Sequence, residues 1–127
     1  MKILISDKMS NKVEDVLKSK SIDYDIKTGL EPNELKLIID DYDGILIRSA
    51  TKLTSDILAN CSNLKVIGRA GVGVDNVDLD VATQNKILVM NTPLGNLEAT
   101  AELTVGLMFS LYRHIHLANA STHEGKW

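Results

Sequence analysis

Short apolar runs alternate with segments of helical periodicity through most of the chain, and this alternation constrains the fold more than any other feature. The runs occupy residues 3–5, 22–26, 45–47, 65–68 and 87–89. Run 22–26 alternates polar and apolar residues, which is typical of an edge strand with one solvated face, whereas run 45–47 is apolar throughout, as a central parallel strand is. Five strands separated by helices predict a doubly wound α/β domain with a parallel sheet.

The segments between the expected strands show helix-start signals. Four helices are expected: after Ser10 as N-cap, at Pro32, at Thr54 or Ser55, and over residues 79–84. Right-handed crossovers and an edge second strand favour the flavodoxin-like strand order 2-1-3-4-5. Ligands of such sheets bind beyond the carboxyl ends of the strands, so a functional site is expected in the loops that follow them.

The final segment differs from the rest of the chain. Residues 97–120 have helical character throughout, and their apolar residues cover most of the helical wheel. A helix that is apolar nearly all round is buried on several sides, whereas a small five-stranded domain covers only one. We therefore expect residues 1–96 to form the binding domain and residues 97–127 a long helix that packs on another domain or subunit. The alternative is a core helix with a few exposed apolar residues.

Composition narrows the class of protein. A length of 127 residues fits one domain, and the net charge of −3 lacks the basic excess typical of nucleic-acid binders, so no nucleic-acid or membrane partner is expected. Cys61 is the only cysteine, which excludes an intrachain disulfide and favours a reducing, cytoplasmic setting. The apolar start is too short for a signal peptide, and no apolar run is long enough for a spanning helix.

Three loops at the expected carboxyl ends of strands form the candidate site. Residues 48–51 (Arg-Ser-Ala-Thr) follow the third strand, residues 68–76 the fourth, and residues 90–96 the fifth. Arginine binds phosphate or carboxylate in two-pronged geometry. The glycines Gly71 and Gly73 let backbone N–H groups approach an oxyanion closely. Because these loops are neighbours in the predicted strand order, they describe a pocket for a small, multiply anionic ligand.

Each feature also has a simpler structural interpretation. A lone arginine at a strand end is commonly solvated or salt-bridged, glycines in turns commonly supply positive φ, and Asp75 or Asn76 can cap the following helix. Asp7, after the first strand, invites comparison with a phosphoacceptor receiver module, but that chemistry needs an aspartate where Arg48 stands. A complete dinucleotide fingerprint is excluded, because Asn76 occupies the position of its third glycine.

Four stretches of the sequence are similar to a known family. They are residues 47–51, 66–78, 89–96 and 101–104. In this order they closely resemble the NAD-dependent D-isomer-specific 2-hydroxyacid dehydrogenases. The resemblance covers essentially the whole chain, including residues 125–127, which match the stretch just before the family's nucleotide-binding domain.

The resemblance implies roles for individual residues. Arg48 and Arg69 match positions that hold a substrate phosphate, with Ser49 beside Arg48 as a further substrate contact. The backbone of a four-residue turn matches the cradle for the substrate carboxylate: Ala70, Gly71, Val72 and Gly73. Val72 also matches a contact to the nicotinamide end of NAD, and Asn96 matches the loop that lines the active-site cleft.

The resemblance also implies an activity for an intact enzyme. This activity is the oxidation of 3-phospho-D-glycerate to 3-phosphooxypyruvate with hydride transfer to NAD, at the entry to serine biosynthesis. The family's glycine fingerprint and its catalytic Arg, Glu and His follow later and match no position here. His114, His116 and His123 match none of them. The isolated chain is therefore expected to be a fragment without turnover, with no catalytic residue and no metal site of its own.

Two alternatives stay open at this point. One is a dehydrogenase for another D-2-hydroxyacid, and the other is a non-catalytic anion-binding or regulatory module of the same fold. A homodimer through residues 97–120 is expected from the apolar helix. Arg113 and Trp127 match positions that contact a neighbouring subunit in some relatives.

Overall fold

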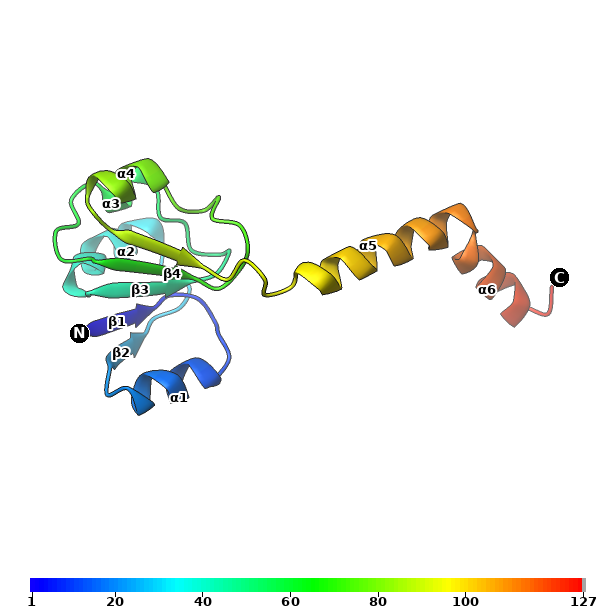
Figure 1. The fold of residues 1–127 in the computed structure, drawn as a ribbon, viewed down its shortest axis with the longest axis horizontal. Helices are drawn as coiled ribbons and strands as arrows, with labels where there is room; N and C mark the ends of the chain where they lie inside the picture. Colours follow the sequence, from blue (N-terminus) through cyan, green and yellow to red (C-terminus); the bar gives the residue numbers. More distant parts are fainter. Residues whose placement is uncertain (127) are drawn as a thin grey trace. The chain divides into compact units, whose positions relative to one another are not determined.

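The computed structural model describes residues 1–126, which divide into a first unit, Met1–Pro93, and a second unit that begins at Leu94. The first unit contains a five-stranded sheet of β1 (Lys2–Ile5), β2 (Asp23–Ile26), β3 (Gly44–Ile47), β4 (Val66–Arg69) and β5 (Leu88–Asn91). All neighbouring strands are parallel, and their order is β2-β1-β3-β4-β5 (Figure 1). The predicted flavodoxin-like strand order is confirmed.

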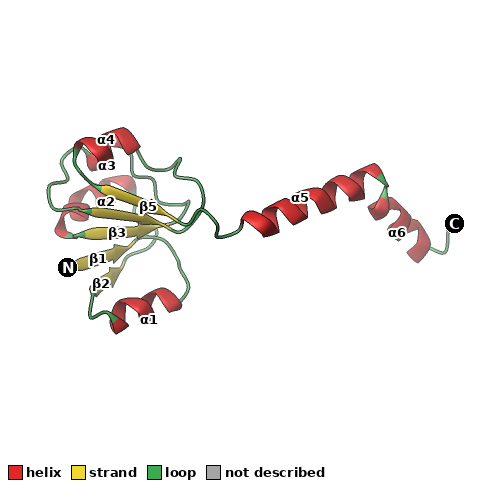
Figure 2. Ribbon diagram, in the orientation of Figure 1, coloured by secondary structure: helices red, strands yellow, loops and turns green. Residues whose placement is uncertain are grey.

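The helices of the first unit lie on both faces of the sheet. They are α1 (Lys12–Ser19), α2 (Pro32–Ile38), the 3-10 turn η1 (Ile39–Asp41), α3 (Ser55–Leu58) and α4 (Leu79–Gln84). Figure 1 shows α1 on one face and α2, α3 and α4 on the other, and Figure 2 shows the same elements by type. This is the doubly wound arrangement that right-handed crossovers produce.

Successive strand residues face two separate apolar cores, because side chains alternate across a strand. The core on the side of α2, α3 and α4 is the larger, and its most buried members include Leu4, Ile39, Ile45, Ile47, Leu58 and Ile67. The core beneath α1 consists of Ile3, Ile5 and Leu17, with half-buried Leu46 packed against it. The central strands are therefore fixed by packing on both faces, which holds their carboxyl ends in place.

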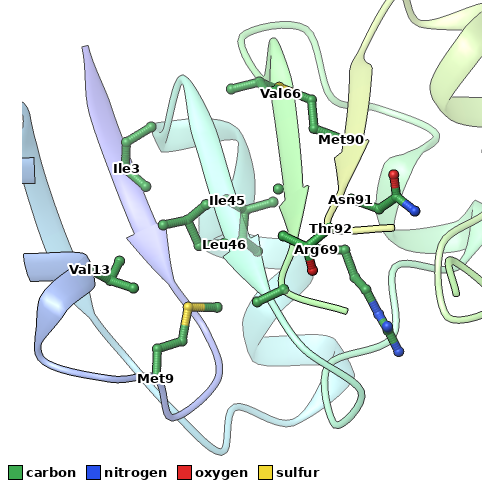
Figure 3. Close-up of a pocket in the computed structure, with 12 residues that line it drawn as sticks. Ile3, Met9, Val13, Ile45, Leu46, Val66, Arg69, Met90, Asn91 and Thr92 are labelled. Carbon is green, nitrogen blue, oxygen red and sulfur yellow. The ribbon is translucent and has the colours of Figure 1, made fainter. Parts of the chain in front are cut away.

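The α1 face is only partly covered where the sheet reaches β4 and β5. Leu88 and Met90 of β5 are exposed, and a hollow of about 310 Å³ opens on this face. Figure 3 shows Met9 and Val13 bordering the hollow near α1, with Val66 and Met90 on the strands. Gly68 leaves room for the Leu46 side chain at the base of the hollow, because a Cβ on residue 68 would stand 2.6 Å from Leu46 Cδ2.

The second unit contains two helices where the sequence predicted one. Helix α5 (Leu97–Tyr112) ends before Arg113, and α6 begins at Ile115 and runs to His123. His114 between them has φ +52°, a left-handed conformation that no helix can continue through. The prediction of one continuous helix over residues 97–120 was therefore wrong at this residue. The match proposed for Trp127 lies outside the described residues.

Helix starts follow the expected pattern with two corrections. Pro32 occupies the first turn of α2, and Thr54 is the N-cap of α3, as predicted. The N-cap of α1 is Asn11 rather than Ser10. The cap of α4 is Asp78, whose side chain accepts from Val81 N at 3.0 Å, so neither Asp75 nor Asn76 caps that helix. Within residues 1–126 no helix is long and apolar enough to cross a membrane.

Candidate functional site

The candidate loops leave the sheet side by side. Ile47 of β3 pairs in register with Arg69 of β4, and Arg69 pairs with Asn91 of β5. Paired strands lie about 4.8 Å apart. The loop that begins at Arg48 and the turn that follows Arg69 therefore start from neighbouring points of the carboxyl edge, as the strand order predicted.

The Arg48 loop is held through its backbone, while the side chains of Arg48 and Ser49 remain exposed. Arg48 N donates to Asp7 Oδ2 at 2.5 Å, and Arg48 O accepts from Asn76 Nδ2 at 2.7 Å. The guanidinium makes one long hydrogen bond, from Nη1 to Lys8 O at 3.5 Å. Arg48 and Ser49 are exposed, so the guanidinium and the hydroxyl are accessible to an anion from solvent.

Arg69 folds back over the glycine turn. A Cβ on Gly71 would stand 1.8 Å from Arg69 Nη1 and 2.6 Å from Arg69 Cζ, so any side chain at this position would displace the guanidinium. Figure 3 shows the Arg69 side chain extending beyond the end of β4, away from the apolar residues of the hollow. Arg69 Nε is buried and has no hydrogen-bond partner within the described chain. The guanidinium therefore retains donor capacity beside the turn.

The glycine turn is fixed by hydrogen bonds from two sides. Ala70 N donates to Ile47 O at 2.9 Å, and Gly71 N donates to Arg69 O at 3.0 Å. On the other side, Asn91 Nδ2 donates to Val72 O at 2.7 Å, and Thr92 N donates to Gly71 O at 3.0 Å.

Two N–H groups of the turn are left for a ligand. Within residues 1–126, the backbone N–H groups of Val72 and Gly73 donate to no protein acceptor. Gly71 and Gly73 do not have positive φ. The simpler interpretation of these glycines, as suppliers of positive φ, was therefore wrong, and Gly71 is needed instead for the space that the Arg69 guanidinium occupies.

Three residues of this region were not among the predicted site residues. Asp7 and Asn76 bind the backbone of the Arg48 loop, and Asn91 binds the backbone of the glycine turn. Asp7 lies two residues after the end of β1, Asn91 is the last residue of β5, and Asn76 ends the loop of residues 68–76. The rule that sites lie beyond these strand ends pointed to their positions, but sequence gives no means of telling which polar side chains will face the backbone.

The remaining predicted positions belong to the second unit. Asn96 is the N-cap residue of α5, is exposed, and makes no capping hydrogen bond with its side chain. Arg113 is the C-cap of α5 and is also exposed. His123 Nδ1 lies 2.9 Å from Asn119 O, one turn back in α6. Within residues 1–126 no group of three or more His, Cys, Asp or Glu side chains is placed to hold a metal ion.

Perturbed carboxyl groups lie away from these loops. The salt bridge from Lys65 and a hydrogen bond from Lys2 N lower the pKa of Asp43, which precedes β3 at the amino edge of the sheet. Hydrogen bonds from Lys2 and Tyr42 lower the pKa of Asp25. Neither ion pair involves Arg48 or Arg69.

Comparison with known proteins identifies relatives of this arrangement. A family model described as "D-isomer specific 2-hydroxyacid dehydrogenase, catalytic domain" matches residues 3–126. A D-3-phosphoglycerate dehydrogenase of Synechocystis sp. is 48% identical over 126 residues, which cover 99% of this chain and 23% of that protein. The D-3-phosphoglycerate dehydrogenase of Archaeoglobus fulgidus is 41% identical over 127 residues, 100% of this chain and 24% of that protein. The chain thus spans about a quarter of the length of these curated relatives.

Two solved structures share the fold at 32% and 38% sequence identity. The NAD⁺-bound 3-phosphoglycerate dehydrogenase of Entamoeba histolytica is 32% identical, with a TM-score of 0.73 over 87% of this chain and 38% of that one. A protein of Pyrococcus horikoshii OT3 is 38% identical, with a TM-score of 0.88 over 99% of this chain and 38% of that one.

Proposed function

Because the chain belongs to the D-isomer specific 2-hydroxyacid dehydrogenase family, we propose that it forms the substrate-binding part of a D-3-phosphoglycerate dehydrogenase. The complete enzyme would oxidise 3-phospho-D-glycerate to 3-phosphooxypyruvate in serine biosynthesis. The main support is the pairing of Ile47 with Arg69, which brings the Arg48 loop and the glycine turn together at one edge of the sheet.

The two arginines would hold the substrate phosphate. Both belong to the carboxyl edge, and neither guanidinium forms a salt bridge with a carboxylate in the described chain. A phosphate can accept two parallel hydrogen bonds from each guanidinium. Ser49 would add a hydroxyl donor from the same exposed loop. Two arginines exceed what one carboxylate needs, which favours a phosphorylated substrate over lactate or formate.

The glycine turn would receive the substrate carboxylate. Because Ala70 and Gly71 already use their N–H groups within the chain, the N–H groups of Val72 and Gly73 are the donors that remain for the ligand. Thr92 N binds Gly71 O and so fixes the N–H of Val72, and the Asn91 amide binds Val72 O and so fixes the N–H of Gly73. Asn96, the N-cap residue of α5, stays a prediction that the family resemblance makes.

The exposed side chain of Val72 fits a contact with the nicotinamide end of NAD, since it is an apolar surface at the tip of a turn whose backbone is fixed. The bound nicotinamide supplies the acceptor for the hydride. The residues of this chain would bind and orient the hydroxyacid. We propose that turnover depends on residues outside this chain and that the 127-residue protein incubated with NAD and 3-phosphoglycerate forms no NADH.

We further propose that residues 97–120 join two copies of the chain. The apolar side chains of α5 include Val105, Met108, Phe109 and Leu111, and all four are at least half exposed. A two-fold dimer that pairs these helices would remove this surface from water.

Titration of the 127-residue protein with three ligands tests the substrate assignment. We expect 3-phospho-D-glycerate to bind with a dissociation constant of about a millimolar, since only one wall of the cleft is present, and D-glycerate and D-lactate to bind more weakly. Equal binding of D-lactate would favour a dehydrogenase for another D-2-hydroxyacid. A micromolar affinity for a phosphorylated ligand would favour the remaining alternative, a stand-alone anion-binding or regulatory module.

A further inference from the structure

Asp7 is a buried carboxylate whose partners are all on the Arg48 loop. Its side chain accepts Arg48 N at 2.5 Å, Thr51 Oγ1 at 2.7 Å and Thr51 N at 3.2 Å. The residue is 6% exposed, and no cation forms a salt bridge with it among residues 1–126. A buried charge is tolerated only when hydrogen bonds replace its lost hydration. Three donors from one loop do so here.

Asn76 binds the same loop from the other side. Its Nδ2 donates to Arg48 O at 2.7 Å and to Thr51 O at 2.6 Å. Its backbone carbonyl also accepts from Leu53 N at 2.8 Å. Asn76 ends the segment that starts with the glycine turn, so these bonds join the turn to the arginine loop.

The two side chains together bind both the N–H and the carbonyl of Arg48, and both the N–H and the carbonyl of Thr51. Fixing the two peptide groups around a residue fixes its backbone dihedral angles and hence the direction of its Cα–Cβ bond. The direction in which the Arg48 side chain leaves the sheet is therefore set by Asp7 and Asn76, although neither contacts the guanidinium. Both oxygens of Asp7 are used in this way, so the carboxylate is not available to a ligand.

We propose that Asp7 and Asn76 are positioning residues for the anion site, which pre-organise Arg48 and tie its loop to the glycine turn. The proposal rests on the proposed function, because it assumes that Arg48 binds the anion. Pre-organisation raises affinity by removing the entropy that a mobile arginine would lose on binding. Asp7 and Asn76 would then influence the affinity for the anion without contacting it.

Asp7→Asn and Asn76→Ala test the proposal, with Asp40→Asn as matched control. Like Asp7, Asp40 is a carboxylate that accepts hydrogen bonds from two backbone N–H groups and one hydroxyl of a single loop. Its donors are Ser62 N, Ser62 Oγ and Asn63 N. We expect Asp7→Asn and Asn76→Ala to weaken 3-phosphoglycerate binding about tenfold, and Asp40→Asn to change it by less than about twofold while lowering stability similarly. If Asp7→Asn does not fold, Thr51→Val is a milder variant, because it removes only the hydroxyl that donates to Asp7. Thr51→Ser keeps this hydroxyl and should bind 3-phosphoglycerate like the wild-type protein.

A double-mutant cycle with Arg48→Ala separates positioning from general destabilisation. If Asp7 acts through Arg48, then Asp7→Asn should cause no further loss of affinity in the Arg48→Ala protein. The same relative loss in both backgrounds would overturn the proposal. So would wild-type affinity in both Asp7→Asn and Thr51→Val.

Amide hydrogen exchange gives a result that does not depend on any ligand. Asp7→Asn should accelerate exchange at Arg48 and Thr51 and leave the Ser62 amide unchanged, whereas Asp40→Asn should do the reverse. If the wild-type protein bound neither 3-phosphoglycerate nor inorganic phosphate, the proposed function would fail. Unchanged exchange at Arg48 in Asp7→Asn would refute the positioning role itself.

Discussion

At the scale of single residues, Gly71 and Arg69 show how the turn serves the side chain before it. The guanidinium occupies the space where a Cβ of residue 71 would lie. Because residue 71 is glycine, the side chain of Arg69, the last residue of β4, can lie over the turn. This arrangement places positive charge beside the two N–H groups of Val72 and Gly73 that are left for an anion.

Gly71→Ala adds one methyl group at this turn. The new methyl group would push the flexible Arg69 side chain aside, so we expect 3-phosphoglycerate affinity to fall about five- to tenfold while the free energy of unfolding changes by less than about 1 kcal/mol. Titration and urea denaturation measure the two quantities. Gly106→Ala is the control, because a Cβ at this position of α5 meets nothing within 4 Å. Wild-type affinity in Gly71→Ala would contradict the role given to this glycine.

At the scale of elements, loops are fixed by side chains that bind the backbone. Asp40, in η1, accepts hydrogen bonds from the turn after α3, and Asp78 caps α4. Burial alone would raise the pKa of Asp40, but hydrogen bonds from Asn63 N and from the hydroxyl and N–H of Ser62 outweigh it and lower the pKa. The carboxylate of Asp40 thus contributes to stability through the turn that it organises.

The pH dependence of stability follows from this direction. A carboxyl group whose pKa is lower in the folded state stabilises the protein fully above its unfolded pKa of about 4 and loses this contribution as the pH falls through the folded value. We expect wild-type stability to decline below about pH 4 and Asp40→Asn to decline less steeply. Urea denaturation at several pH values measures both. Parallel declines in the two proteins would show that Asp40 is not among the groups responsible.

The sequence was sufficient for the strand order, because apolar runs, an alternating edge strand and right-handed crossovers leave few topologies. It was also sufficient for placing the Arg48 loop beside the glycine turn. It failed at His114, since a single left-handed residue that breaks a helix leaves no periodic signal. It also missed Asp7 and Asn76, because their role depends on which backbone groups face them after folding.

At the scale of the whole molecule, the two units differ in how they cover apolar surface. The first unit has a core on each face of its sheet. The second unit has no buried residue among those described, although α5 is rich in large apolar side chains. A large exposed apolar surface usually marks a site of contact with another protein or another copy of the same chain.

We therefore expect the protein to self-associate at micromolar concentration through α5. Met108→Glu combined with Phe109→Glu should give a monomer, since both side chains are more than half exposed and a buried glutamate is costly. Leu37→Glu, at a leucine of α2 that is 82% exposed, should leave the association unchanged. Sedimentation velocity distinguishes these results, and a wild-type monomer across the micromolar range would contradict the expectation.

Calorimetric titration of Arg48→Ala/Arg69→Ala tests whether Arg48 and Arg69 hold the phosphate of a hydroxyacid. Lys65→Ala, which removes one cation at the amino edge of the same sheet, serves as the control. We predict that the double variant loses affinity for 3-phosphoglycerate by about a hundredfold, while Lys65→Ala changes it by less than about twofold. D-glycerate should bind the double variant and the wild-type protein with similar affinity. Undiminished binding of 3-phosphoglycerate to the double variant would contradict the claim.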